Sequence, residues 1–390
     1  MFTMTTNLVD ADTLNVYVVI ISDRHLGPLA GWRPHPNTHT WELVMETIAS
    51  LAAPLEPAPA DAWPTGWRAL ARAVWFGHRG LAVLTLGALG LLVASLGLQL
   101  VDGRQVLGAP AWMKPDKFAA SIALAAPTLA WILGQMRRDR RWRRLDRAGR
   151  VVAVVAALEL LGITIQAARG VPSHFNNATA IDRAVFAVMG LAISVLWVAE
   201  LYVTVRAFRV RFVTPLRTWA VRLGLVGTLL GGAVGALMPR PTAAQLESLR
   251  AGRGAPQLGA HAIGVPDGGP GLPFTRWSTE GGDLRVPHFF GLHALQALPV
   301  AAWLLERRRH RQRPQTSSPA SARPIVALGV AWLGVTAVTL WQALRAQPLL
   351  APDAPTLFGL AVVLVAAVAI AIARGEGLSH RPPASARVSS

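Results

Sequence analysis

Six polar side chains interrupt or border two long apolar stretches of this sequence, and their chemistry suits proton transfer, ligand binding or metal coordination. Imidazole and carboxylate groups titrate and coordinate metal ions, while a carboxamide donates and accepts hydrogen bonds. Such groups are costly inside a membrane unless they are paired or used. The six residues are Glu159, Gln166, His174, His288, His293 and Gln296.

The spacing of these residues predicts a shared polar column. Gln166 follows Glu159 by seven residues, which on a helix places it on nearly the same face and about 10 Å further along. His288 and His293 are about 140° apart on a helical wheel with Gln296 between them, so these three side chains can border one cavity. If the two stretches touch, the groups pair by depth from the membrane surface to its midplane: His174 with His288, Gln166 with His293, and Glu159 with Gln296.

Two other interpretations of these residues stay open. Polar groups inside a membrane also hydrogen-bond between helices, which stabilises each contact by about 1 kcal/mol without any ligand. Alternatively, His174, His288 and His293 are ligands of a metal ion or a haem. The five-residue spacing of His288 and His293 differs from the His-Glu-x-x-His helix of metalloproteases. No motif here assembles a Ser-His-Asp triad, so the sequence assigns no catalytic residue.

The composition is that of a membrane protein. Of 390 residues, 52% are hydrophobic and only 15% are charged, and the mean hydropathy is +0.39. The absence of cysteine excludes disulfides, zinc–thiolate sites and covalently attached c-type haem. The net charge of +17 comes almost entirely from arginine, since Lys114 and Lys117 are the only lysines. The arginines cluster beside apolar segments, which indicates membrane topology and not nucleic-acid binding.

Eight apolar segments of sufficient length must position the polar residues. The predicted fold class is all-α, a polytopic integral membrane helix bundle of about eight transmembrane helices within residues 80–374. The predicted spans are Leu81–Val101, Phe118–Met136, Val151–Ala168, Ala184–Val205, Trp219–Met238, Val286–Leu305, Ile325–Leu344 and Thr356–Ala373.

Basic residues predict the orientation of the spans. The connecting segments on the side of both termini hold 27 of the 38 lysines and arginines, with Arg222 counted among them, and the alternate segments hold 11. Both termini are therefore predicted to be cytoplasmic, in the inner membrane of a bacterium. The lipid bilayer is the predicted partner, and the run Arg137–Arg144 is predicted to anchor the chain to anionic lipid.

Four segments lie outside the predicted spans. Residues 1–53 are predicted to form a small cytoplasmic extension, and residues 54–79 a Pro/Ala linker followed by an interfacial helix. The outer loop, residues 239–285, is rich in glycine and proline and shows no evident secondary structure. Residues 375–390 are predicted to be a disordered cytoplasmic tail.

Three motifs resemble those of a family of uncharacterised bacterial multi-pass integral membrane proteins. The motifs are Trp112-Met113-Lys114-Pro115-Asp116-Lys117-Phe118, Ser173-His174-Phe175-Asn176, and His288 to Gln296 in the form HFxGLHxLQ. The resemblance covers roughly residues 80–310. It implies the membrane architecture and brings no assigned activity.

These features predict a transporter or sensor for a small molecule or an ion, with an outward-facing polar column. In this interpretation Glu159 titrates, His293 and Gln296 bind the ligand, and His174 and His288 line the entrance. A membrane enzyme or redox protein that uses a metal or haem is the alternative. A structural membrane protein without a pocket is the third interpretation.

Overall fold

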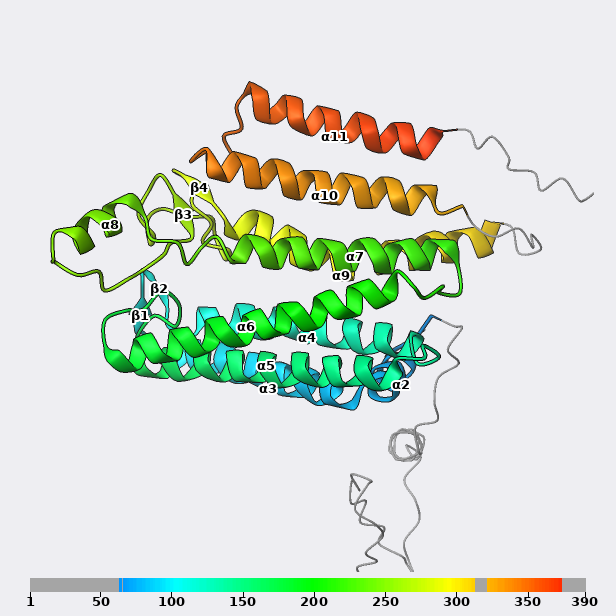
Figure 1. The fold of residues 1–390 in the computed structure, drawn as a ribbon, viewed down its shortest axis with the longest axis horizontal. Coiled ribbons are helices and arrows are strands. Elements are labelled where there is room, and N and C mark those ends of the chain that lie inside the picture. The colour runs from blue at the N-terminus through cyan, green and yellow to red at the C-terminus, as the bar shows by residue number, and fades with distance from the viewer. Residues whose placement is uncertain (1–62, 65, 313–320, 374–390) are drawn as a thin grey trace, which may run out of the picture. The chain divides into compact units, whose positions relative to one another are not determined.

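The computed structural model describes residues 63–64, 66–312 and 321–373, and within these ranges it confirms the predicted fold class (Figure 1). Eight of the described helices are long and apolar enough to cross a membrane. The chain is therefore a multi-pass membrane protein. The eight helices are α3 (Arg79–Val101), α4 (Met113–Gln135), α5 (Trp142–Arg169), α6 (Ala180–Ala207), α7 (Pro215–Gly235), α9 (Arg285–Gln312), α10 (Arg323–Leu344) and α11 (Ala354–Ile372).

A short amphipathic helix, α2 (Trp67–Gly77), precedes the first span in the segment predicted to be interfacial. It buries Val74 and exposes Trp67 and Leu70. α2 crosses α4 closely, because a Cβ on Gly77 would lie only 2.2 Å from the carbonyl oxygen of Ala130. The predicted extension of residues 1–53 and the predicted tail of residues 375–390 lie outside the described residues.

The long loop between α7 and α9 contains regular structure, so the expectation of a loop without secondary structure is wrong. It holds α8 (Ala243–Arg250) and an antiparallel pair, β3 (Ala262–Ile263) with β4 (Gly282–Asp283). Thr242 and Gln245 form a capping box at the start of α8, in which each side chain accepts a hydrogen bond from the other's backbone N–H. This Thr-x-x-Gln signal marks the start of a helix of only eight residues, and hydrophobic periodicity does not reveal so short a helix.

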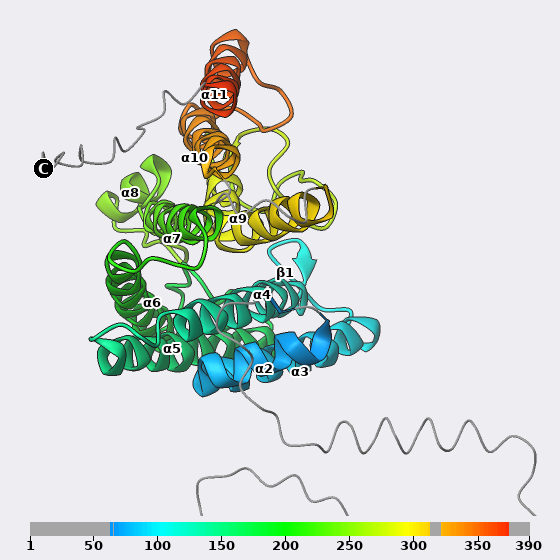
Figure 2. The ribbon, with the colours of Figure 1, turned by 90° about the vertical axis from the view of Figure 1, so that its right-hand side faces the viewer.

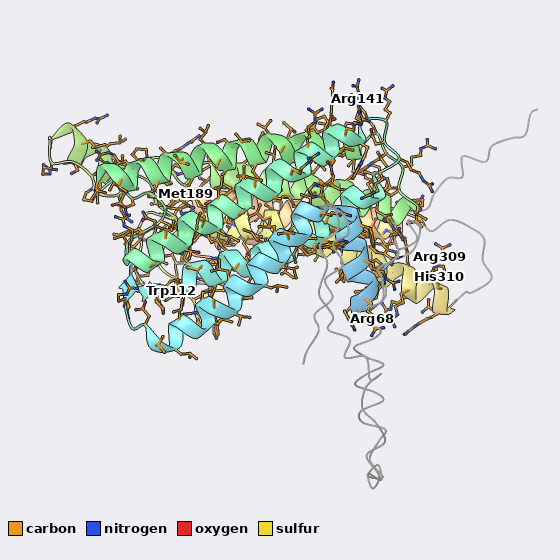
Figure 3. All side chains as sticks on the ribbon, turned by 90° about the horizontal axis from the view of Figure 1, so that it is seen from below. Arg68, Trp112, Arg141, Met189, Arg309 and His310 are labelled. Carbon is orange, nitrogen blue, oxygen red and sulfur yellow. The ribbon has the colours of Figure 1, made fainter. Side chains whose placement is uncertain are left out.

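The connections between spans alternate between two faces of the bundle. Figure 3 shows Arg141, Arg309 and His310 toward one end of the bundle and Trp112 toward the other. We name these ends the arginine face and the loop face. The arginine face comprises residues 136–141, residues 208–214 and the C-terminal end of α9. The loop face comprises β1 (Gln105–Val106), β2 (Ala109–Pro110), residues 170–179, α8, β3, β4 and residues 345–353.

The spans pack as two groups (Figure 2). Helices α3 to α6 pack on one another, with α2 against α4, while α7, α9 and α10 form a second group on which α11 packs through α10. The groups meet where α4 contacts α9 and where α6 contacts α7. The two spans expected to carry the polar column, α5 and α9, are not a tightly packed pair, because α4 contacts both. α4 is therefore positioned to contribute to a site between these two spans.

Glycine permits the close approach of α7 and α9. A Cβ on Gly231 would lie 2.5 Å from the backbone nitrogen of Leu292, and one on Gly291 would lie 2.4 Å from Cα of Gly231. Neither distance leaves room for a side chain, as is common where small residues bring membrane helices together. One turn along α7, the ring of His288 lies 3.0 Å from where a Cβ of Gly235 would be. The glycine seam thus sets the position of His288 against α7.

Candidate functional site

The segment that joins α5 to α6, residues 170–179, is folded into the protein and carries His174. α5 ends at Arg169 and is capped by Gly170, whose φ of 70° lies in the left-handed region that glycine adopts readily. The N–H of Leu258 donates to the carbonyl of Phe175 at 2.9 Å, so the long loop holds this segment in place. Three of its residues, Ser173, Phe175 and Asn176, are each 3% exposed.

His174 contacts the carboxylate of Glu159 on α5. Its Nε2 lies 3.2 Å from Oε1 of Glu159, and its Nδ1 lies 3.0 Å from the hydroxyl of Ser173. Glu159 is 3% exposed, and its Oε2 has no hydrogen-bond partner among the described residues. A buried carboxylate oxygen without a partner is unfavourable. The pair therefore leaves one acceptor available for a ligand, a proton or a cation.

Three phenylalanine rings surround the imidazole of His174. The centroid of His174 lies 5.8 Å from that of Phe118 and 6.1 Å from those of Phe175 and Phe186. Burial, together with the positive charge of Lys114, lowers the pKa of His174 well below its ordinary value, so the ring is neutral near pH 7. Yet 21% of this side chain remains accessible to water. The surrounding groups exclude most water from the ring of His174, but part of the side chain stays exposed.

Lys114, in the first turn of α4, brings a positive charge to this pair. Its amine has no hydrogen-bond acceptor among the described residues, and it lies 6.0 Å from the centroid of Phe118. The other lysine, Lys117, differs in that its amine donates to the carbonyl of Thr275 at 3.1 Å. The charged neighbours of Lys114 are Glu159 and Asp267, which attract it, and Arg285 and Lys117, which repel it.

The long loop adds a second histidine–carboxylate pair. Nδ1 of His261 lies 2.8 Å from Oδ2 of Asp267, whose carboxylate also accepts the backbone N–H groups of His261 and Ala262. Burial opposes ionisation of Asp267, but these hydrogen bonds outweigh it and lower the pKa of Asp267 to about 2. Burial lowers the pKa of His261 despite this carboxylate. The ring of His261 stacks edge-on against Phe175 at 4.9 Å, which links this pair to the segment that carries His174.

His288 and His293 lie on the other group of helices. Nδ1 of His288 donates to the carbonyl of Gly231 on α7 at 2.7 Å, since a carbonyl can only accept. His288 is close enough to His174, His261 and His293 for the charges of the rings to interact. No hydrogen bond or ring contact among the described residues joins His288 to His174, the pairing expected from depth, and the two rings interact only through their charges.

His293 and Gln296 form a contact of their own, one turn apart on α9. The side chain of Gln296 lies near the ring of His293, but no hydrogen bond joins them, since Oε1 of Gln296 has no hydrogen-bond partner among the described residues. The centroid of His293 lies 4.2 Å from that of Phe289, which in turn contacts Trp277 of the long loop. No contact in the described part of the chain joins Gln296 to Glu159, the pairing expected from depth.

Gln166 belongs to a different cluster. Its side-chain nitrogen donates to Asp182 on α6 at 3.0 Å, and Arg169 pairs with the same carboxylate at 2.7 Å. The side chain of Gln166 is fully buried in this contact between α5 and α6. The expected pairing of Gln166 with His293 is not found, because Asp182, in the first turn of α6, satisfies the carboxamide instead.

The three histidines considered as metal or haem ligands do not point at one centre. His174 faces Glu159 and Ser173, His288 faces the Gly231 carbonyl, and His293 faces Gln296. Within the described ranges, no group of three or more His, Asp or Glu side chains is arranged to hold a metal ion.

Sequence reasoning found Glu159 and His174 but missed three of the neighbours that define their surroundings, Lys114, His261 and Asp267. Lys114 carried a usable signal, since only two of the 38 basic residues are lysines and both lie in one seven-residue motif. His261 and Asp267 carried none, because they lie in a loop whose fold depends on distant contacts.

Comparison of the chain with protein-family models, with curated proteins and with solved structures finds no match.

Proposed function

We propose that this chain is a transporter or sensor of a small molecule or an ion in the inner membrane of a bacterium, and that Glu159 and His174 form the centre of its binding site. The observation that carries the proposal is Oε2 of Glu159, a buried carboxylate oxygen without a partner among the described residues. A purely structural contact between helices normally satisfies its polar atoms.

The position of the pair supports binding over structure alone. His174 and Glu159 belong to the first group of helices, while His288 belongs to the second and interacts electrostatically with His174. Ligand sites in helical membrane proteins commonly lie between helices of a bundle, where a few polar groups converge among apolar ones. A ligand at this boundary would contact both groups and could change how they pack.

The binding site is proposed to open toward the outside, with the loop face outward and the arginine face in the cytoplasm. The basic residues support this orientation through the positive-inside rule. The chain has no cysteine, so single cysteines can be labelled without background. In right-side-out vesicles, Ser248→Cys on α8 should react with a membrane-impermeant thiol reagent and Arg140→Cys should not; the reverse pattern would overturn the orientation.

Transport is tested in proteoliposomes that contain a pH-sensitive dye. We expect one class of solute, among sugars, amines, carboxylates and inorganic ions, to drive proton movement that Glu159→Gln abolishes. The matched control is Glu200→Gln, which removes a carboxylate from α6 that has no hydrogen bond to His174. Solute binding without flux would identify a sensor. If no solute binds or moves, a structural role remains.

A metal-dependent function is the second candidate, because of the orientation of two rings. His261 and His288 each direct Nδ1 at an oxygen, which is how proteins often orient a histidine whose Nε2 binds a metal. Metal analysis of the purified protein by mass spectrometry, with an absorption spectrum for haem, tests this candidate. A stoichiometric metal lost in both His261→Ala and His288→Ala would favour it over transport of a metal-free solute.

A further inference from the structure

We infer that the ligand of this site is a small organic carboxylate, whose negative charge binds the amine of Lys114. This inference rests on the proposed function and names the substrate class of the same site. It follows from the donors of Lys114, the balance of charges around it, and the apolar surroundings of His174.

The amine of half-buried Lys114 is accessible to solvent and has no hydrogen-bond acceptor among the described residues. It carries three donors, and none of them reaches an acceptor in the part of the chain that the structure describes. Its electrostatic attraction to Glu159 does not amount to a hydrogen bond, because Oε2 of Glu159 is also without a partner. Lys114 therefore has donors that are not used within the described part of the protein, and a carboxylate ligand supplies the acceptor that they lack.

The charges near Lys114 favour an anion. The charged groups that act on the two lysines, taken with the lysines themselves, are four cations and three carboxylates. The cations are Lys114, Lys117, Arg276 and Arg285, and the carboxylates are Glu159, Asp267 and Asp283. Two carboxylates are already engaged, since Asp283 pairs with Arg285 at 2.6 Å and Asp267 with His261 at 2.8 Å. The local excess of positive charge is compensated by one added negative charge.

The choice of lysine at this position fits a compact anion. The other 36 basic residues are arginines, so lysine at positions 114 and 117 is an exception to the composition of the chain. An ammonium is a compact point charge with rotatable donors, whereas a guanidinium is planar and needs more room. A single carboxylate within reach of Glu159 and His174 suits the smaller group.

The surroundings of His174 favour an organic ligand over an inorganic ion. The ring centroid of Phe118 lies 6.0 Å from the amine of Lys114 and 5.8 Å from the ring of His174, and Phe186 packs on the same histidine. These apolar rings offer contact to carbon atoms and offer no hydrogen bond to an inorganic anion. The polar end of the ligand would lie at Lys114 and its apolar part beside these rings.

Three probes of one shape and different charge test the inference: benzoate, benzamide and benzylammonium. Each is added to the full-length protein in detergent, up to about 10 mM, which is ten times a Kd of about 1 mM. Unfolding is followed by the fluorescence of the 14 tryptophans. We expect benzoate to raise the midpoint of thermal unfolding and the other two probes to leave it unchanged, since a ligand that binds only the folded state stabilises it.

Variants of the two lysines attribute the effect to the site. Lys114→Met should weaken benzoate binding at least about tenfold, as expected for loss of a charged hydrogen bond. Lys117→Met, whose amine is already bonded to the Thr275 carbonyl, should reduce the benzoate-induced shift less than Lys114→Met does, because it lowers the local positive charge without removing a donor available to the ligand. If Lys114→Met does not fold, a single cysteine in Phe118→Cys provides a second measurement, because benzoate should slow its alkylation by a thiol reagent.

Several outcomes would overturn the inference. Stabilisation by benzylammonium that depends on Glu159 would identify a cation site, and equal stabilisation by chloride would identify an inorganic anion. A benzoate effect that persists in Lys114→Met, or no effect of acetate, lactate, succinate or benzoate, would also refute it. If sugars or amines alone drive flux that Glu159→Gln abolishes, the proposed function stands and only the carboxylate class fails.

Discussion

Replacing Glu159 with glutamine is expected to separate stability from function. The substitution removes a buried charge that has one unsatisfied oxygen, while it keeps a polar group 3.2 Å from the ring of His174. The free energy of unfolding should therefore change by less than about 1 kcal/mol, although solute-driven proton movement is lost. Denaturant unfolding in detergent measures the first quantity and the proteoliposome assay the second. A loss of several kcal/mol would show that the carboxylate is structural.

His174→Ala, unlike Glu159→Gln, is expected to lower the stability of the protein. It leaves both oxygens of the buried Glu159 without a partner, and it removes the imidazole from its contacts with three phenylalanine rings. Together these losses should lower the free energy of unfolding by about 2–3 kcal/mol. His310→Ala, at the exposed end of α9, is the matched control and should be neutral. Equal effects of the two substitutions would contradict the pairing of His174 with Glu159.

Acidification is expected to destabilise the loop face through His174 and His261. Burial lowers the folded-state pKa of both rings below the unfolded value near 6.5. Below about pH 6.5 the unfolded chain therefore binds protons that the folded chain does not, and stability falls as the pH is lowered. Asp267, with a folded pKa of about 2, adds stability that is present above about pH 4 and is lost as the pH falls through 2.

The measurement for this pH dependence is the midpoint of thermal unfolding at pH 7.5 and at pH 5.5. The wild type should unfold at a lower temperature at pH 5.5, and His261→Gln should show a smaller difference between the two pH values. A midpoint that rises on acidification would contradict the lowered pKa of both histidines.

At the scale of residues, the sequence singled out candidate side chains but did not predict their partners. Glu159 stood out because polar groups are costly at membrane depth, and His174 because it follows the outer end of the same span. Their contact was not predictable, because it depends on a fold of residues 170–179 that distant backbone hydrogen bonds maintain. Gln166 shares a helical face with Glu159, yet Asp182 provides its partner from α6. Helical periodicity predicts the direction and the depth of a side chain but not which helix packs beside it.

Among elements, the contact of α7 with α9 is the one most sensitive to side-chain size. Gly291→Val is expected to lower the free energy of unfolding by about 2–3 kcal/mol, because a Cβ there would lie 2.4 Å from Cα of Gly231. The matched control is Gly90→Val on α3, where nothing lies within 4 Å of the added Cβ. Unfolding midpoints and yields of both variants provide the comparison. Similar losses in both would show that helix propensity, and not the seam, determines the effect.

Hydropathy located all eight spans but not the ends of the helices. α5 begins at Trp142, nine residues before the predicted start at Val151, and α9 continues to Gln312 beyond the predicted end at Leu305. Both extensions are rich in arginine, whose long side chains can reach the polar membrane surface while the helix continues. The apolar window ends where the charged residues begin, but the helical backbone hydrogen bonds continue beyond that point.

At the scale of the whole bundle, the two groups of helices are joined at the arginine face by a cluster around Trp63. Its indole stacks on Trp131 of α4 at 5.0 Å and donates to Glu306 of α9, so one residue contacts both groups. The guanidinium of Arg217, on α7, lies 4.3 Å from the indole of Trp63 in a cation–π contact. Thr214, which caps α7, donates its hydroxyl to Glu306. The contacts that join the two groups therefore occur at both faces, and those around Trp63 lie at the end opposite the candidate site.

Removal of this cluster is expected to loosen the arginine face and leave the loop face intact. Trp63→Ala deletes the stack on Trp131 and the hydrogen bond to Glu306, which should lower the free energy of unfolding by about 3–4 kcal/mol. A single cysteine in Gln135→Cys, at a half-buried position beside Arg217, should then be alkylated faster, because a separation of the groups, which Trp63 opposes, would expose this position further. Arg140→Cys, already exposed, should react at the same rate with and without Trp63→Ala. If Gln135→Cys reacts no faster in the Trp63→Ala background, α4–α9 and α6–α7 packing alone holds the two groups together. Trp63 would then pack on the arginine face without contributing to the association of the groups.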